Sequence, residues 1–307
     1  MLGKWLERRD EVVATLPPAL GEATLEAIAA NCVLAGCLTG HLPVVAAAVQ
    51  AVSHRRFNLD AVVTGLNSAS PVVIVDGPIV EELAFNSGAG ALGAGNRANA
   101  AIGRAVQLCI RNIGGARHGE LDGATHGHSG KYSYLIAASQ TSPWEPLRTR
   151  LGFGADDSLV TVKAADAPLC VADMGHDDAT SILETIARSV AIPGSYNAYF
   201  RQELWLVLSP EHAWRLSDAG IGPDEIALYI HEFATISAGQ LRGHGLYGFV
   251  DETLPPTWIQ DAADSDLISV VDRPDRVRVL VSGGLHGGYT SVLLGQGVSV
   301  SQKVESW

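Results

Sequence analysis

Residues 71–105 read PVVIVDGPIVEELAFNSGAGALGAGNRANAAIGRA, and this stretch decides the fold class. Its first part, PVVIVDG, is apolar almost throughout, as expected for a strand that is buried on both faces. A glycine-rich segment follows, and Asn96 then opens a run with helical periodicity that extends to residue 112. A buried strand that leads through a loop into a helix is the repeating unit of layered α/β proteins.

The same alternation of patterns extends along most of the chain. Six further apolar runs have strand character, at residues 61–66, 132–138, 158–164, 204–209, 277–283 and 298–304. Helical patterns are clearest at residues 23–36, 42–54, 96–112, 178–191, 211–219 and 223–238. The sequence therefore predicts an α/β fold with layered, mostly parallel or mixed sheets and flanking helices.

A polar stretch that contains Asp and Gly, AADAPLCVADMGHD, is the best candidate for a domain boundary. We expect two associated α/β lobes, an N-terminal lobe at 1–165 that carries the glycine-rich loop and a C-terminal lobe at 166–307. At 307 residues the chain is long enough for two domains of ordinary size. A loop within a single domain would have the same composition.

Charge and cysteine usage exclude some classes of protein. The formal net charge of −12 argues against a general affinity for nucleic acid or for an anionic membrane. The four cysteines, Cys32, Cys37, Cys109 and Cys170, form no CxxC pair, which indicates reduced thiols. We find no signal peptide and no apolar run long enough to span a membrane, so we expect a soluble, cytoplasmic protein.

The glycine-rich loop matches neither of the common nucleotide-binding patterns. Three of its glycines have the G-x-G-x-x-G spacing, but the helical segment 78–83 separates them from the preceding strand. No strand that ends in Asp or Glu follows at the distance a dinucleotide site requires. A Walker loop also fails, because Asn96-Arg97 stands where Lys-Ser/Thr is needed.

The remaining features favour an anion site where this loop meets the helix. Glycines allow backbone N–H groups to converge there, and a helix N-terminus carries positive partial charge. Arg97, Arg104 and Arg111 are spaced by seven and lie on nearly one face, with successive members roughly 10 Å apart along the axis. One small ligand could engage the first two but hardly all three. The predicted ligands of a carboxylate or phosphate are Asn86, Ser87, Arg97, Asn99 and Arg104. A solvated arginine stripe beside a packing turn is the alternative.

The segment DGATHGHSGKY, at residues 122–132, concentrates titratable groups on a second glycine-rich loop. Loops that a sheet positions often carry catalytic groups, so Lys131 and His126 are candidates for moving protons and Asp122 for orienting a base. His126-x-His128 could bind zinc or iron if a third ligand arrived from elsewhere. The sequence shows no third ligand, so we predict no cofactor and keep a divalent metal as the alternative. Exposed turn residues would have the same pattern.

Two further candidates lie beside helix starts. His212 follows the predicted strand 204–209 directly, at the edge where ligands of open α/β sheets gather. Cys37 precedes the helix start GHLP, where a thiol can have a lowered pKa and act as a nucleophile. Helix capping and packing is the alternative for His212, and burial as a small apolar side chain is the alternative for Cys37.

Several blocks of the sequence resemble a known bacterial family. They are NCVLAGCLTGHLPVVAAAV, FNL, VDGPI, NSGAGALGAGNRANAAIGRA, GGARHGELDGATHGHSGKY and SPWEPL. Over most of residues 24–304 the chain resembles the large C-terminal region of bacterial UGSC-type selenoprotein relatives, but it lacks their selenocysteine-Gly-Ser-Cys segment. The resemblance implies a shared scaffold and a site between Asn86 and Lys131, and it implies no particular reaction.

These patterns together predict an enzyme that acts on a small anionic, carboxylate-bearing molecule. We expect non-redox acid/base or nucleophilic chemistry of the lyase or hydrolase type, in which Lys131, with His126 and His212, moves protons. One alternative is a thiol redox or transfer enzyme centred on Cys37, and another is a non-catalytic protein that binds small anions. We expect no nucleic-acid or membrane partner, and the sequence is compatible with a homo-oligomer.

Overall fold

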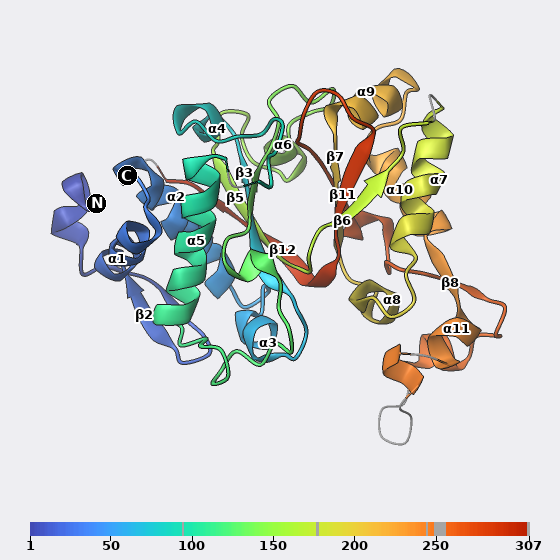
Figure 1. Cartoon of the computed structure of the whole chain (residues 1–307), viewed down its shortest axis with the longest axis horizontal. Coiled ribbons are helices and arrows are strands. Elements are labelled where there is room, and N and C mark those ends of the chain that lie inside the picture. The colour runs from blue at the N-terminus through green and yellow to red at the C-terminus, as the bar shows by residue number, and fades with distance from the viewer. Residues whose placement is uncertain (94, 176–177, 244, 249–255, 306–307) are drawn as a thin grey trace. The chain divides into compact units, whose positions relative to one another are not determined.

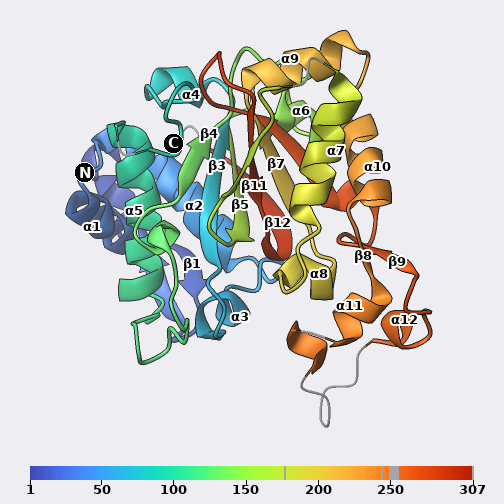
Figure 2. The same ribbon diagram turned by 45° about the vertical axis from the view of Figure 1, so that its right-hand side comes forward.

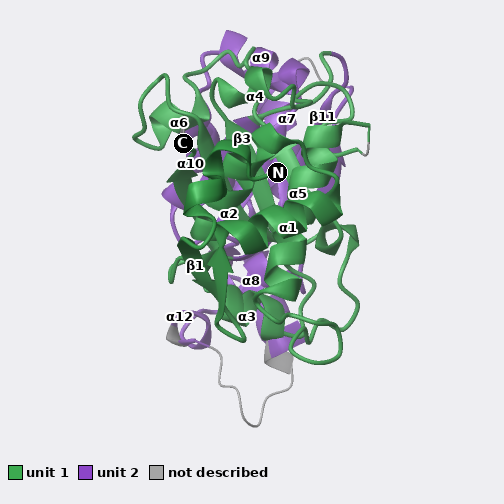
Figure 3. Cartoon of the chain, turned by 90° about the vertical axis from the view of Figure 1, so that its left-hand side faces the viewer, with its two compact units in different colours: residues 1–167, 281–285, 297–307 green, residues 168–280, 286–296 purple. Residues whose placement is uncertain are grey.

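The structure is a computed structural model that describes residues 1–93, 95–175, 178–243, 245–248 and 256–305. The chain divides into two compact units, which are coloured separately in Figure 3. Unit 1 comprises Met1–Ala167, Val281–Leu285 and Gly297–Trp307, and unit 2 comprises Pro168–Leu280 and His286–Gln296. The predicted continuous lobe 166–307 is therefore wrong in one respect, because two segments near the C-terminus belong to unit 1.

Unit 1 is built on a four-stranded sheet with the order β12-β5-β3-β4 (Figure 1). Its strands are β3 (Ser70–Asp76), β4 (Leu135–Ala137), β5 (Leu159–Ala165) and β12 (Gly295–Lys303). Strand β3 pairs parallel with β4 and antiparallel with β5, so the sheet is mixed. Every residue of β3 and β5 is buried, including the polar Thr161 and Lys163, in strands whose sequence is otherwise largely apolar.

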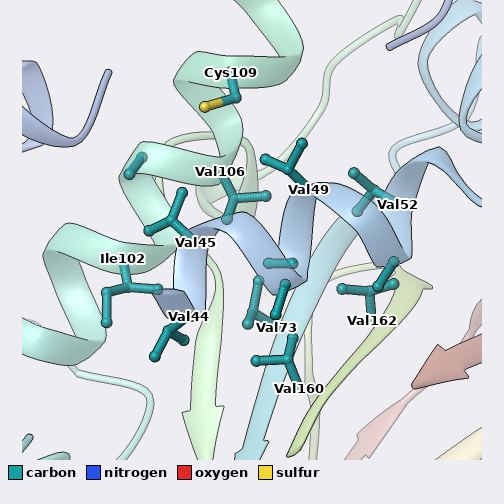
Figure 4. Close-up of a cluster of buried hydrophobic side chains, with 14 of the residues drawn as sticks. Val44, Val45, Val49, Val52, Val73, Ile102, Val106, Cys109, Val160 and Val162 are labelled. Carbon is teal, nitrogen blue, oxygen red and sulfur yellow. The ribbon is translucent and has the colours of Figure 1, made fainter. Parts of the chain in front are cut away.

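The helices and the remaining strands of unit 1 complete its layers. They are β1 (Val12–Leu16), β2 (Gly21–Thr24), α1 (Leu25–Ala35), α2 (Leu42–Ser53), α3 (Leu59–Thr64), α4 (Ile79–Glu82), α5 (Arg97–Asn112) and α6 (Leu147–Arg150). Val73 of β3 and Val160 and Val162 of β5 are buried together with Val49 of α2 and Val106 of α5 (Figure 4). Helices α2 and α5 thus bury one face of the sheet, and this core holds α5 in place.

One predicted strand is wrong. The run AVVTGL at residues 61–66 lies mostly in helix α3, where Val62 and Val63 are buried. A short apolar run has the same composition in a buried strand and in a buried helix, so periodicity cannot separate the two. Asn58, at the start of this helix, has a left-handed backbone with φ of 56°, which turns the chain into the helix.

Unit 2 has its own four-stranded sheet, with the order β10-β7-β11-β6 (Figure 2). Its strands are β6 (Leu169–Ala172), β7 (Leu204–Leu208), β10 (Val277–Val281) and β11 (Tyr289–Leu293). Strand β11 is antiparallel to both β6 and β7. The remaining elements are α7 (Ala179–Val190), α8 (Tyr196–Phe200), α9 (Pro210–Asp218), α10 (Pro223–Phe233), β8 (Thr235–Ser237), α11 (Ala238–Gly243), α12 (Thr257–Gln260) and β9 (Leu267–Ser269).

The predicted fold class is confirmed, since both units combine a sheet with flanking helices. The larger sheets contain antiparallel pairs, and the β3–β4 pair is parallel. Among the described residues, no helix is both long and apolar enough to cross a membrane.

Candidate functional site

Helix α5 approaches the following loop closely, and Gly103 makes this approach feasible. A Cβ atom at Gly103 would lie 2.6 Å from Oγ of Ser133 and 2.9 Å from the backbone nitrogen of Tyr134. The Ser133 hydroxyl also donates a 2.8 Å hydrogen bond to the carbonyl of Ala100. The first half of α5 is therefore held against Ser133 and Tyr134, which directly follow residues 118–132, the segment that we call the histidine loop.

A cavity of about 340 Å³ lies within unit 1, between the C-terminal half of α5 and the histidine loop. This volume lies near the lower end of the range for small-molecule sites, roughly 300–1,000 Å³. Its polar lining side chains are Ser70, Arg104, Gln107, Arg111, His118, Asp122, His126, His128, Lys131 and Tyr132. The structure thus brings Lys131, Asp122 and His126, which the sequence singles out, to one site together with Arg104.

Asp122 is the centre of the hydrogen-bond network at this site. Its buried carboxylate accepts two hydrogen bonds from Nζ of Lys131, at 2.7 and 2.9 Å, and one from the amide of Ala124. Nδ1 of His118 lies 3.0 Å from Oδ2 of the same carboxylate. The carboxylate of Asp122 therefore holds the ammonium of Lys131 by two hydrogen bonds, and the imidazole of His118 lies beside the same carboxylate.

His118 is the functional candidate that the sequence reading missed. No hydrogen bond from a described residue fixes the tautomer of this ring, but a neutral imidazole that carries its proton on Nδ1, the nitrogen beside Asp122, would leave Nε2 as an acceptor. The side chain is 66% exposed and lines the cavity, so Nε2 can reach a ligand. The sequence does place His118 four residues before Asp122, but this spacing indicates a side-chain contact only within a helix.

His128 has a structural role instead of a chemical one. Its Nδ1 accepts the amide of Gly130 at 3.0 Å, and its Nε2 donates to the carbonyl of Ala165 at 3.2 Å. Its ring contacts Tyr134 edge-on, with centroids 5.4 Å apart. Burial lowers the pKa of this imidazole, which favours the neutral form. Both ring nitrogens are engaged, so a metal ion could bind His128 only after one of these hydrogen bonds broke.

Metal binding was the alternative for the His126-x-His128 pair. His126 is exposed and lines the cavity, whereas His128 is turned to its backbone partners. In the part of the chain that the structure describes, no three His, Cys, Asp or Glu side chains converge as ligands of a metal ion.

The cavity is lined by Arg104 and Arg111 of α5, whereas the sequence predicted a ligand at Arg97 and Arg104. Arg104 is half-buried, lines the cavity and donates from Nη1 to the carbonyl of Tyr132 at 3.4 Å. Arg111, two turns later, also lines the cavity, whereas the exposed Arg97 is not among its lining residues. The sequence pattern favoured Arg97 with Arg104 because both are near the helix start, but the cavity lies beside the other end.

The predicted anion ligands Asn86, Ser87 and Asn99 do not line this cavity. The buried Asn99 side chain accepts the amide of Asn86 at 3.0 Å and donates to the carbonyls of Asn86 and Ala91 at 2.8 and 3.1 Å. The carbonyl of Ser87 accepts the amide of Gly283 at 2.9 Å. The side chain of Asn99 and the carbonyl of Ser87 therefore hold the loop at residues 86–93, which we call the glycine loop, and the predicted anion cradle of this loop stays a prediction.

Asn86 and Asn96 complete the internal bonding of this region. The Asn86 side chain accepts the amide of Gly88 at 2.9 Å and donates to the carbonyl of Ala89. The Asn96 side chain accepts the amide of Asn99 at 3.0 Å, as a helix N-cap does. Polar groups that looked available for an anion thus bind one another.

His212 belongs to unit 2, and both of its ring nitrogens are engaged there. The side chain is fully buried, with Nδ1 2.9 Å from Oγ1 of Thr290 and Nε2 3.0 Å from the carbonyl of Asp173. Since a carbonyl only accepts, Nε2 carries the proton and Nδ1 accepts from the threonine hydroxyl. This arrangement is a correction of the predicted proton-moving role, because a neutral imidazole with two internal partners has no group left for a substrate.

Comparison with models of known protein families and with curated proteins found no match. The resemblance to UGSC-type relatives therefore stays a prediction that rests on the quoted sequence blocks. The function has to be argued from the cavity itself.

Proposed function

We propose that the protein is an enzyme that binds a small carboxylate- or phosphate-bearing anion in the cavity beside α5 and transfers a proton on it. One observation supports this most strongly: two arginines line the same cavity as a lysine and a histidine that share one carboxylate. Perturbed or paired titratable groups inside a cavity of ligand size are characteristic of active sites.

The charge of the lining favours an anion. Arg104, Arg111 and Lys131 provide three positive charges, and Asp122 provides one negative charge. The two guanidinium groups start roughly 10 Å apart along the helix axis, which suits a ligand with two polar ends. Guanidinium groups bind carboxylate and phosphate in two-pronged geometry, so they would orient the ligand and also attract it.

The proton-transfer groups are His118 and Lys131. Nδ1 of His118 lies 3.0 Å from the carboxylate of Asp122, and a neutral ring with its proton on Nδ1 would present Nε2 as a base. The Lys131 ammonium, fixed by two hydrogen bonds of 2.7 and 2.9 Å, can stabilise negative charge that develops on the substrate or return a proton to a leaving group. Removal of a proton from carbon would start a lyase reaction, and removal from water would start a hydrolysis.

The test combines binding with proton transfer. Inorganic phosphate and a panel of small mono- and dicarboxylates are first screened by isothermal titration calorimetry. Compounds that bind are then incubated with the protein in deuterium oxide and followed by NMR. We expect at least one bound compound to take up deuterium at carbon or to be cleaved. Binding without either change would contradict the proposal and would favour the non-catalytic anion-binding protein.

Two matched histidine variants make this test specific. General acid–base groups typically contribute roughly 10²- to 10⁴-fold, so H118N should lower the rate by at least 100-fold. H126N should lower it less, because the carboxylate of Asp122 lies 3.0 Å from the ring of His118 and would stabilise the charge on that ring as it takes up a proton. A larger loss in H126N would move the base to His126.

A further inference from the structure

The end of helix α1 brings two cysteines together although their spacing matches no dithiol motif. Cys32 lies in the last turn of α1, and Gly36 ends the helix with a left-handed φ of 83°. The amide of Cys37 then donates a 2.9 Å hydrogen bond to the carbonyl of Cys32. This reversal returns the chain over the last turn and places Cys37 beside Cys32.

Two buried side chains act on the thiol of Cys37. One is the thiol of Cys32, which is fully buried, and the other is the ring of His41, which is 2% exposed. Nδ1 of His41 accepts the amide of Leu38 at 3.2 Å, so this nitrogen carries no proton. Nε2 is then the protonated nitrogen of the ring, and the neutral imidazole can act as a donor.

The surroundings of the two thiols lower the pKa of Cys37 and raise the pKa of Cys32. The hydrogen bond from Cys32 and then the contact with His41 lower the pKa of Cys37 to about 6, although partial burial opposes this. The hydrogen bond to Cys37 and burial raise the pKa of Cys32 far above its ordinary range. The other groups that act on this pair are the thiol of Cys109 on α5 and the N-terminal amine. At neutral pH the pair therefore consists of a thiolate and a thiol.

We propose that Cys37 and Cys32 form a redox-active thiol pair that a small hydroperoxide oxidises to an intrachain disulfide. The Cys37 thiolate attacks one oxygen of the hydroperoxide, the O–O bond breaks, and the alkoxide or hydroxide that leaves takes up a proton. The resulting Cys37 sulfenic acid is attacked by the sulfur of Cys32, which forms the S–S bond. The hydroxide of the sulfenic acid leaves and takes up the proton of the Cys32 thiol to form water. Over both steps the two sulfurs supply the two electrons that reduce the O–O bond of the hydroperoxide.

The location of the pair fits a small oxidant. Cys37 is only partly exposed and Cys32 is fully buried, so a bulky disulfide would not reach either sulfur easily. Neither cysteine lines the cavity beside α5. The inference therefore does not rest on the proposed acid/base function, and each can fail without the other.

Peptide mass spectrometry after peroxide treatment tests the pair directly. The protein is treated with a small excess of hydrogen peroxide at pH 7, alkylated and digested. We expect a linked Cys32–Cys37 peptide, lighter by two hydrogen atoms and separated by dithiothreitol. The exposed Cys170 should stay alkylatable, and C170S should form the same linked peptide. Oxidation of Cys170 before Cys37, or no linked peptide in the wild-type protein, would overturn the proposal.

Two variants separate the steps without relying on the disulfide. C32A removes the main group that lowers the pKa of Cys37, so the sulfenic acid should form more slowly than in the wild-type protein. It should then persist and be captured by dimedone, because its resolving thiol is gone. The rate of Cys37 alkylation by iodoacetamide in the wild-type protein should have its pH midpoint near 6. In H41A the midpoint should move up toward the ordinary thiol value of about 8.5. A wild-type midpoint at that ordinary value would contradict the activation of Cys37.

Discussion

Two glycine-containing loops adjoin helix α5, and they differ in the partners of their polar side chains. The glycine loop (residues 86–93) precedes the helix and satisfies its own groups, mainly through Asn99. The histidine loop (residues 118–132) follows the helix and keeps His118, His126 and Lys131 at a cavity. Both loops are rich in glycine, but only the histidine loop carries titratable side chains, so the difference teaches that the side chains and their hydrogen-bond partners, and not the glycines, decide which loop can bind a ligand.

The largest effect should come from breaking the network of the histidine loop. D122A leaves the Lys131 ammonium, whose side chain is 12% exposed, without its carboxylate. Removal of one partner of a buried ion pair typically costs about 3–5 kcal/mol, and we expect a loss of this size in the free energy of unfolding, measured by urea denaturation. The double variant D122A/K131A should recover part of the loss. A loss below about 1 kcal/mol would mean that the pair is solvated.

A somewhat smaller loss should follow from opening the glycine loop. N99A removes three hydrogen bonds and leaves an amide and two carbonyls of the loop without their partner. Buried groups that lose a partner typically cost 1–3 kcal/mol, so we expect about 3 kcal/mol in the same denaturation experiment. The affinity of the folded variant for a small anion should not change. Loss of affinity without loss of stability would restore Asn99 as a ligand-binding residue.

The fold was largely predictable because its strands are buried on both faces. The runs that contain Val73 and Val160 are largely apolar and form strands β3 and β5. The run at 61–66 was mistaken because a short apolar run has the same pattern in helix α3. The sequence also did not predict that the last strand, β12, belongs to the sheet of unit 1, since its pairing with β5 depends on tertiary contacts.

The site was predictable only in part. The seven-residue spacing agrees with the place of Arg104 and Arg111 at one cavity, but which end of the helix meets the cavity depends on tertiary packing that the spacing does not contain. His212 looked functional because of its place after a strand, whereas its partners Thr290 and Asp173 are distant in sequence. The Cys32–Cys37 contact was missed because it depends on a chain reversal after a helix.

The central claim is that the cavity beside the C-terminal half of α5, and not the glycine loop, binds the anion. The most direct measurement is the Kd of the best-binding small anion for the wild-type protein, R111A and R97A by isothermal titration calorimetry. A charge-assisted hydrogen bond contributes roughly 1.5–3 kcal/mol, so R111A should weaken binding by roughly 10- to 100-fold. R97A, which alters an exposed arginine outside the cavity lining, should bind as the wild-type protein does. Weaker binding in R97A together with unchanged binding in R111A would contradict the claim and return the anion to the glycine loop.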